Sequence, residues 1–145
     1  QVGEGVTGVS FNDLNQIEKI NVMEILESCG LVLEVDEEKL DIITAISGSG
    51  PAYVFLLINA LADGGVRLGL SKTEAIKVAS QTFLGAAKMV LETGLHPEVL
   101  KDMVTSPGGT TAQGLSKMEE YSMRSGMIET AKATYDKAKE LGRKE

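Results

Sequence analysis

The chain has 145 residues, a length for which a single domain with its own hydrophobic core is expected. Hydrophobic residues make up 43% and charged residues 24%, which is the balance of a soluble globular protein. The formal net charge of −7, without any run of Lys or Arg, argues against a nucleic-acid surface or an anionic-membrane surface. Cys29 has no second cysteine to pair with and no signal-peptide pattern opens the chain, so we expect a cytoplasmic protein.

The first part of the chain predicts one helix between two short strands. Residues 2–10 combine glycines with β-branched residues, which indicates a short strand or connector. Ser10 or Asn12 offers a helix start, and the apolar residues from Leu14 to Leu26 give the helix a broad apolar face. Gly30 suits a left-handed end to this helix, and residues 31–35 form a plausible second strand.

A second segment, residues 42–65, is an apolar helical pattern that Ser47-Gly-Ser-Gly-Pro51 interrupts. From Ala52 to Leu61 the apolar residues surround the helix, so the helix must be covered on all sides. Either the rest of the chain or a second subunit could cover it, and both alternatives remain open here. The apolar run 51–62 is too short for a membrane span, which needs about 20 residues.

The remaining segments are helical. Ser71 caps a helix with apolar residues at helical spacing that ends near Gly94, Pro97 suits the first turn of the next helix, and a last helix runs from about 127 to 141. The predicted fold class is therefore all-α: a helical bundle with a long, buried central helix.

The turn Ser106-Pro-Gly-Gly109 carries the clearest local chemistry. It joins two predicted helices and directs backbone N–H groups and hydroxyls toward the positive end of the second helix, an arrangement that binds a carboxylate or a phosphate. The structural alternative is a plain helix–helix turn in which Thr110 or Thr111 serves as the N-cap.

The sequence resembles the C-terminal helical domain of pyrroline-5-carboxylate reductase. Segments 47–53, 62–66, 85–89 and 95–97 match that family, and the resemblance covers essentially all of residues 1–145, which we take as one dimerisation and substrate-binding domain. The family signature is present without a break at Pro97, Leu100, Val104, Thr105, Ser106, Gly108, Gly109, Thr111, Gly114, Leu115, Met118 and Glu119.

The resemblance implies hydride transfer from NADPH, with NADH as the alternative donor, to 1-pyrroline-5-carboxylate, which yields L-proline. It implies an intertwined homodimer, with assembly of dimers into rings as a further possibility, and a catalytic contact from Thr44 near the nicotinamide amide and the substrate. Thr44 could instead be a helix residue that bonds back to its own turn. The implied ligands of the substrate carboxylate are Ser106, Gly108, Gly109, Thr110 and Thr111.

The resemblance also defines what the chain lacks. Family members bind the dinucleotide with an N-terminal Rossmann domain, and we find no Gly-rich fingerprint in a βαβ unit here, so the cofactor should bind mainly outside this chain. A non-catalytic helical oligomerisation module and a small-anion-binding module remain alternatives. His96 is interpreted as a helix-entry residue, and one histidine with a distant cysteine predicts no metal site.

Overall fold

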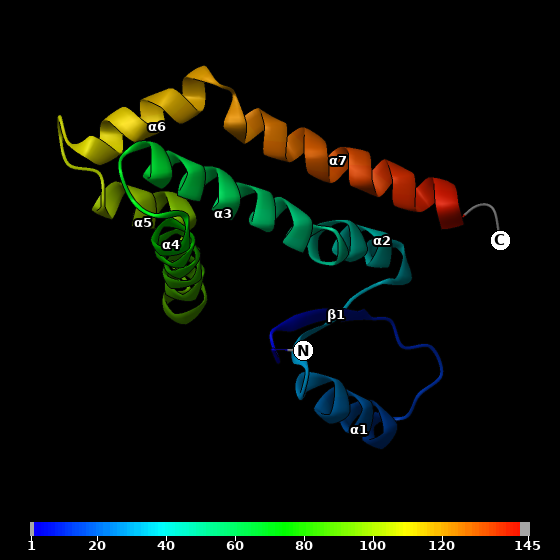
Figure 1. Ribbon diagram of the computed structural model, residues 1–145. Coiled ribbons are helices and arrows are strands. Elements are labelled where there is room, and N and C mark those ends of the chain that lie inside the picture. Colours follow the sequence, from blue (N-terminus) through cyan, green and yellow to red (C-terminus); the bar gives the residue numbers. More distant parts are fainter. Residues whose placement is uncertain (1, 143–145) are drawn as a thin grey trace. The chain divides into compact units, whose positions relative to one another are not determined.

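The computed structural model describes residues 2–142, which form mainly helices (Figure 1). The predicted helical fold class is confirmed. The chain divides into two compact units, residues 1–51 with 127–145 and residues 52–126, and each unit is described by itself.

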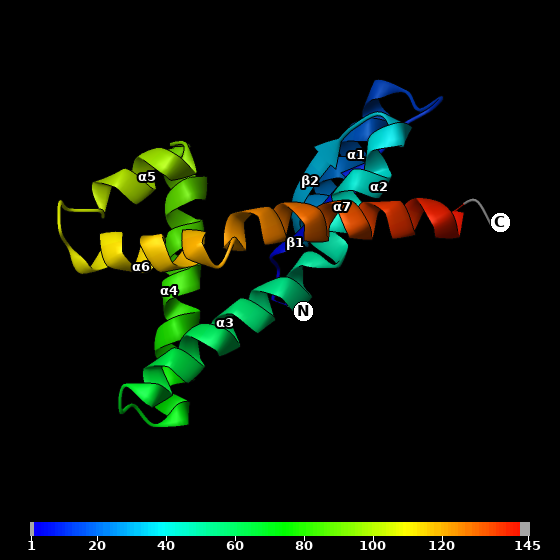
Figure 2. The same ribbon diagram turned by 90° about the horizontal axis from the view of Figure 1, so that it is seen from above.

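The first unit begins with a strand–helix–strand arrangement: β1 (Gly5–Val9), α1 (Gln16–Glu27) and β2 (Gly30–Glu34). The two strands are parallel, with Gly5 opposite Gly30 and Val9 opposite Glu34 (Figure 2). The sequence predicted two short strands here but not their parallel pairing. Short strands rich in glycine give no pairing signal, so their parallel register could not be foreseen. The turn from β1 to α1, residues 10–15, contains no glycine and so does not form a dinucleotide fingerprint.

Helix α1 starts later than predicted. Its N-cap is Asn15, whose side-chain oxygen accepts hydrogen bonds from the backbone N–H groups of Ile17 and Glu18, while the Glu18 carboxylate accepts the N–H of Asn15. This reciprocal capping box outcompetes Ser10 and Asn12 because it satisfies more of the free donors at the helix end. The helix also ends at Glu27, with Ser28 as its C-cap, before the glycine that we expected to stop it.

Gly30 opens β2 with φ of +136°, and a Cβ there would lie 2.2 Å from the carbonyl oxygen of Gly5. We therefore expect Gly30→Ala to break the β1–β2 pairing and to lower the melting temperature by several degrees, more than Gly69→Ala does. Gly69 is the matched control, because its φ of +111° imposes similar strain while a Cβ there meets nothing within 4 Å. Equal melting temperatures for the two variants in differential scanning calorimetry would contradict the steric argument.

A continuous helical segment, Glu37–Arg67, spans the predicted interruption at Ser47–Pro51. It consists of a 3-10 turn η1 (Glu37–Lys39), α2 (Leu40–Ile43), a π-helical turn η2 (Thr44–Gly48) and α3 (Gly50–Arg67). The regular α-helix is thus interrupted between Ile43 and Gly50, as predicted, but the chain does not leave the helix, because it absorbs Pro51 by widening one turn.

By length and composition alone, this 31-residue segment could cross a membrane. The prediction that the apolar run 51–62 is too short for a membrane span considered only part of this helix. Core helices of soluble proteins can have the same length and apolar composition.

In the second unit, α3 packs against α4 (Lys72–Thr93) through small residues. Ala62, Ala75 and Ala79 are buried together, with Ile58 against them. Because alanines occupy the contact, the two helix backbones approach closely. The predicted limits of α4 are confirmed: Ser71 forms a capping box with Glu74, and Gly94 ends the helix in the left-handed conformation with φ of 64°.

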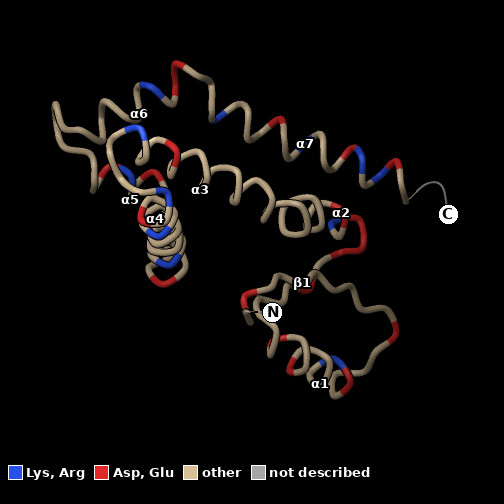
Figure 3. Tube along the Cα trace, viewed as in Figure 1, with Lys and Arg blue, Asp and Glu red and all other residues tan. Residues whose placement is uncertain are grey.

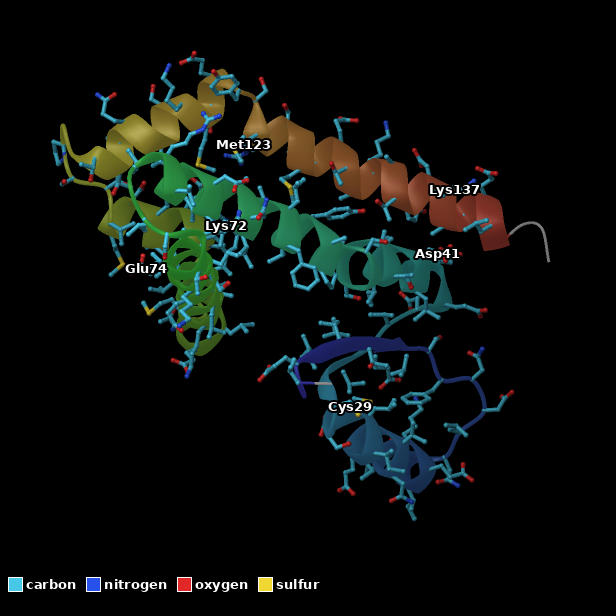
Figure 4. All side chains as sticks on the ribbon, viewed as in Figure 1. Cys29, Asp41, Lys72, Glu74, Met123 and Lys137 are labelled. Atoms are coloured by element: carbon cyan, nitrogen blue, oxygen red, sulfur yellow. The ribbon has the colours of Figure 1, made fainter. Side chains whose placement is uncertain are left out.

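A polar contact accompanies the α3–α4 packing. The Lys72 ammonium, labelled in Figure 4, donates to the Asn59 side-chain oxygen at 2.8 Å and pairs with the Asp63 carboxylate. Asn59 in turn donates to Asp63 at 3.1 Å. All three groups are exposed, so their contribution to stability is small and they mainly fix the angle between the helices.

The surface of α3 remains largely uncovered within one chain. Among its described residues only Ala62 is buried, whereas Phe55 and Leu56 are 68% and 69% exposed. Its only charged residues are Asp63 and Arg67, both near its end (Figure 3). Among the described residues, the single chain therefore does not provide the predicted burial of this helix.

Candidate anion-binding site

The candidate site begins at α5 (Pro97–Met103), whose entry is fixed by His96 and Pro97. The His96 Nδ1 atom accepts a hydrogen bond from the Glu98 N–H at 3.2 Å, so the histidine is the N-cap, as its position before a proline predicts. His96 therefore stabilises the start of α5, which agrees with our interpretation of it as a helix-entry residue.

After α5 the chain makes a tight turn at Ser106–Gly109. The Gly109 N–H donates to the Ser106 carbonyl at 3.0 Å, and Gly108 has φ of +69°. Proline at the second position and a positive φ at the third are the marks of a type II turn, which explains the Pro-Gly pair. The preceding Thr105 is held by its hydroxyl, which donates to the Lys101 carbonyl at 2.7 Å.

Gly109 brings the turn and the following helix close to the Ser106 side chain. A Cβ at Gly109 would lie 2.3 Å from the Ser106 hydroxyl oxygen and 3.1 Å from the Ser106 carbonyl oxygen. A side chain at this position would therefore push Ser106 aside. The absence of a side chain leaves the Ser106 hydroxyl beside the start of α6 (Thr110–Glu120).

The N-terminus of α6 supplies free hydrogen-bond donors. Its N-cap is Gly109, and no side chain caps this helix end. The alternative that Thr110 or Thr111 is the N-cap is therefore wrong, because both lie inside the first turn. The backbone N–H groups at the start of a helix have no intrahelical acceptor and lie at its positive end, so they suit an anion.

The structure thus brings Ser106, Gly108, Gly109, Thr110 and Thr111 together in one turn. Ser106 and Thr110 are exposed, whereas Gly109 and Thr111 are half-buried. Within the described residues 2–142, the Thr111 hydroxyl has no hydrogen-bond partner in the chain, so it is available to a ligand. The group combines backbone donors with hydroxyls, which is the chemistry that a carboxylate accepts.

Near this turn α5 carries Glu98, Lys101 and Asp102, and Arg124 of α7 (Met123–Gly142) reaches Glu98. Lys101 and Arg124 both pair with the Glu98 carboxylate, and the Lys101 hydrogen bond together with its charge lowers the pKa of Glu98 below its ordinary value. The positive end of α6 is therefore not supplemented by a free basic cluster in this part of the chain (Figure 3). Recognition of an anion here depends on backbone dipoles and hydroxyls.

Thr44, the predicted catalytic residue, belongs to the first unit and lies in the π-helical turn η2. Its side chain is exposed, and its hydroxyl donates to the Leu40 carbonyl at 2.9 Å. The alternative that Thr44 bonds back to its own turn is therefore correct for the hydroxyl proton. The same geometry leaves the oxygen lone pairs free, so Thr44 can accept a hydrogen bond from a ligand N–H group.

The first unit contains a cleft that the sequence did not predict. A cleft of about 490 Å³ lies beyond the carboxyl ends of β1 and β2, lined by residues that include Phe11, Glu34, Asp36 and Lys39. The Asp36 and Lys39 side chains form an ion pair with each other, and Glu34 pairs with Lys19. These charges already have partners, and nothing in their pattern suggests a ligand.

Comparison with known proteins identifies the family. The family model for pyrroline-5-carboxylate reductase dimerisation matches residues 37–141. The chain belongs to the pyrroline-5-carboxylate reductase family. This match confirms the predicted resemblance and covers α3, α4, the Ser106–Gly109 turn and most of α7 (Met123–Gly142), which starts four residues before the predicted position.

Individual relatives agree with the family match. A pyrroline-5-carboxylate reductase from Synechocystis is 46% identical over 144 residues, which is 99% of this chain and 54% of the relative. One from Arabidopsis thaliana is 50% identical over 120 residues, covering 83% of this chain and 44% of the relative.

Solved structures of reductases have the same fold. A reductase from Coxiella burnetii superimposes with a TM-score of 0.92 at 41% identity, covering 97% of this chain and 53% of that chain. A Plasmodium falciparum pyrroline carboxylate reductase solved with NADP bound gives a TM-score of 0.85 at 39% identity, covering 97% and 54%. The chain thus spans about half the length of the relatives it matches.

Proposed function

We propose that this chain provides the dimerisation and substrate-binding part of an enzyme that reduces 1-pyrroline-5-carboxylate to L-proline with NADPH. The observation that carries the proposal is the uncapped N-terminus of α6 beside Ser106 and Thr111, within a chain of this family. The cofactor supplies the hydride. The residues of this chain hold the substrate so that its C=N carbon faces the nicotinamide.

The substrate carboxylate is the natural ligand of the Ser106–Thr111 turn. Backbone N–H groups of Thr110 and Thr111 and the Thr111 hydroxyl would donate hydrogen bonds to its two oxygens, while Gly108 and Gly109 shape the turn. The proposed contact from Thr44 is the acceptance of an N–H hydrogen bond, from the substrate iminium or from the nicotinamide amide. This role follows from its hydroxyl proton being engaged by Leu40.

A homodimer would cover the exposed apolar surface of α3. The name of the matching family model, the exposure of Phe55 and Leu56, and the scarcity of charge along the helix all support this arrangement. The same arrangement accounts for the apolar length of Glu37–Arg67 without a membrane, because the partner subunit replaces lipid as the covering surface.

The β1–α1–β2 unit suggests a refined domain boundary. The family match starts at residue 37, and a two-stranded parallel sheet is not stable alone, because parallel sheets are normally larger and covered on both faces. We therefore propose that residues before 37 pack with the α/β, nucleotide-binding part of the enzyme, and that the dimerisation domain begins near Glu37.

The experiment that tests the proposed function is a turnover assay of the full-length enzyme. Oxidation of NADPH should depend on added 1-pyrroline-5-carboxylate, and L-proline should appear in equal amount. A full-length protein that binds the cofactor and is folded, yet forms no proline from this substrate, would contradict the proposal.

The chain alone should lack measurable affinity for NADPH. The β1–α1 turn has no glycine fingerprint, so a pyrophosphate has no close backbone approach there. In isothermal titration calorimetry we expect no saturable heat from NADPH with the fragment and clear saturation with the full-length enzyme. Saturable binding by the fragment at micromolar concentration would show that cofactor contacts lie within this chain.

A further inference from the structure

The π-helical turn Thr44–Gly48 coincides with the one proline in the middle of a long helix. Pro51 lies inside the continuous helical segment Glu37–Arg67. In a regular α-helix, residue 51 would donate its N–H to the Ser47 carbonyl, but proline has no N–H and its ring collides with that carbonyl. Widening the turn just before Pro51 relieves the collision, so the proline explains the position of η2.

Side-chain hydroxyls support the widened turn. Thr44 donates to the Leu40 carbonyl at 2.9 Å, and Ser47 donates to the Ile43 carbonyl at 2.8 Å. These bonds supplement the backbone ladder where its regular spacing changes. The turn is therefore built by Pro51 together with two residues whose side chains can bond to helix carbonyls.

The widened turn decides which way Thr44 faces. One extra residue in a turn rotates everything before it by about 100° about the helix axis relative to a regular α-helix. Gly48 lies next to Thr44 in this turn: a Cβ at Gly48 would be in ordinary van der Waals contact with the Thr44 methyl carbon, at 3.6 Å. Thr44 is exposed in this orientation, with its lone pairs available to a ligand.

We propose that Pro51 is a positioning residue: through the π-helical turn it holds the Thr44 hydroxyl in the direction from which it contacts the substrate or the nicotinamide. This inference rests on the proposed function of Thr44. With alanine at position 51 the missing N–H is restored, the turn relaxes to a regular α-helix, and Thr44 rotates away from the ligand.

The test uses the full-length enzyme with Pro51→Ala, Thr44→Val and the double variant. We expect Pro51→Ala to keep or raise the melting temperature, because it removes a helix-interrupting residue, and to lower kcat/KM for 1-pyrroline-5-carboxylate about 100-fold through misplacement of Thr44. Adding Thr44→Val to Pro51→Ala should cause no further loss. Thr44→Ser should retain activity, since the hydroxyl remains.

Pro51→Ser, which restores the same N–H with another side chain, is the second variant and should reproduce the loss. Three results would each overturn the inference. Pro51→Ala could have the wild-type kcat/KM, or it could have a lowered melting temperature with unchanged kinetics. The double variant could also lose activity by the product of the two single losses.

The outcomes separate this inference from the proposed role of Thr44. If Thr44→Val is fully active, Thr44 makes no functional contact and both statements fail. If Thr44→Val loses activity while Pro51→Ala does not, the contact stands and only the positioning role of Pro51 is overturned.

Discussion

Replacing Phe55 by glutamate should dissociate the dimer. Phe55 is 68% exposed in the single chain, so the charge costs little in the isolated subunit. In a dimer that covers α3, the substitution loses about 1.5–3 kcal/mol of apolar burial and adds several kcal/mol for an unpaired buried charge. Since each 1.4 kcal/mol is about tenfold in affinity, the dissociation constant should rise by about a thousandfold or more.

Sedimentation velocity across a concentration series measures this effect. Phe55→Leu is the matched control, because it keeps an apolar side chain and should remain dimeric. The choice of an exposed position matters. The neighbouring Leu57 is half-buried in its own chain, so a charge there would also destabilise the subunit. A wild-type chain that sediments as a monomer, or a Phe55→Glu variant that remains dimeric, would show that α3 is covered in another way.

Thr111→Ala should impair use of the substrate while leaving use of the cofactor intact. A hydrogen bond to a charged group contributes about 1.5–3 kcal/mol, so kcat/KM for 1-pyrroline-5-carboxylate should fall about 10- to 150-fold, with little change in the KM for NADPH. The melting temperature should hardly change, because Gly109, not Thr111, is the N-cap of α6. Thr111→Ser should keep most of the activity.

Steady-state kinetics and thermal unfolding on the same preparations separate the two roles of Thr111. If Thr111 served only the helix, Thr111→Ala would change the stability of the enzyme while the kinetics stayed unchanged. That pair of results would remove Thr111 from the substrate site.

Much of the helical framework could be predicted because its signals are local. Ser71 and Gly94 bound α4 through their own capping geometry, and the Pro-Gly pair after Ser106 specifies a tight turn. The residues of the candidate anion site are contiguous in sequence, so recognising the turn was enough to bring them together. The resemblance to the family rested on the same contiguous motif.

The features that could not be predicted depend on contacts or on competition between neighbours. The parallel pairing of β1 and β2 joins residues 25 positions apart, such as Gly5 and Gly30, and leaves no periodic trace. Asn15 wins the α1 cap over Ser10 only because Glu18 completes a capping box. The proline pattern indicated a broken helix, whereas a π-helical turn lets the helix continue.

Burial of α3 is a property that one chain cannot reveal. Its all-round apolar pattern predicts a covered helix, but within the described residues no surface covers it. We expect the proposed homodimer to cover the apolar residues of α3 that are exposed in the single chain.

The central claim is that the Ser106–Thr111 turn holds the substrate carboxylate, and a substrate without that group tests it most directly. The measurement compares kcat/KM for 1-pyrroline-5-carboxylate and for 1-pyrroline, the same ring without a carboxylate, in wild type and in Thr111→Ala. We expect the wild type to prefer the carboxylate substrate, and Thr111→Ala to reduce this preference about 10- to 150-fold by slowing only that substrate. An equal loss for both substrates, or an unchanged preference, would contradict the account.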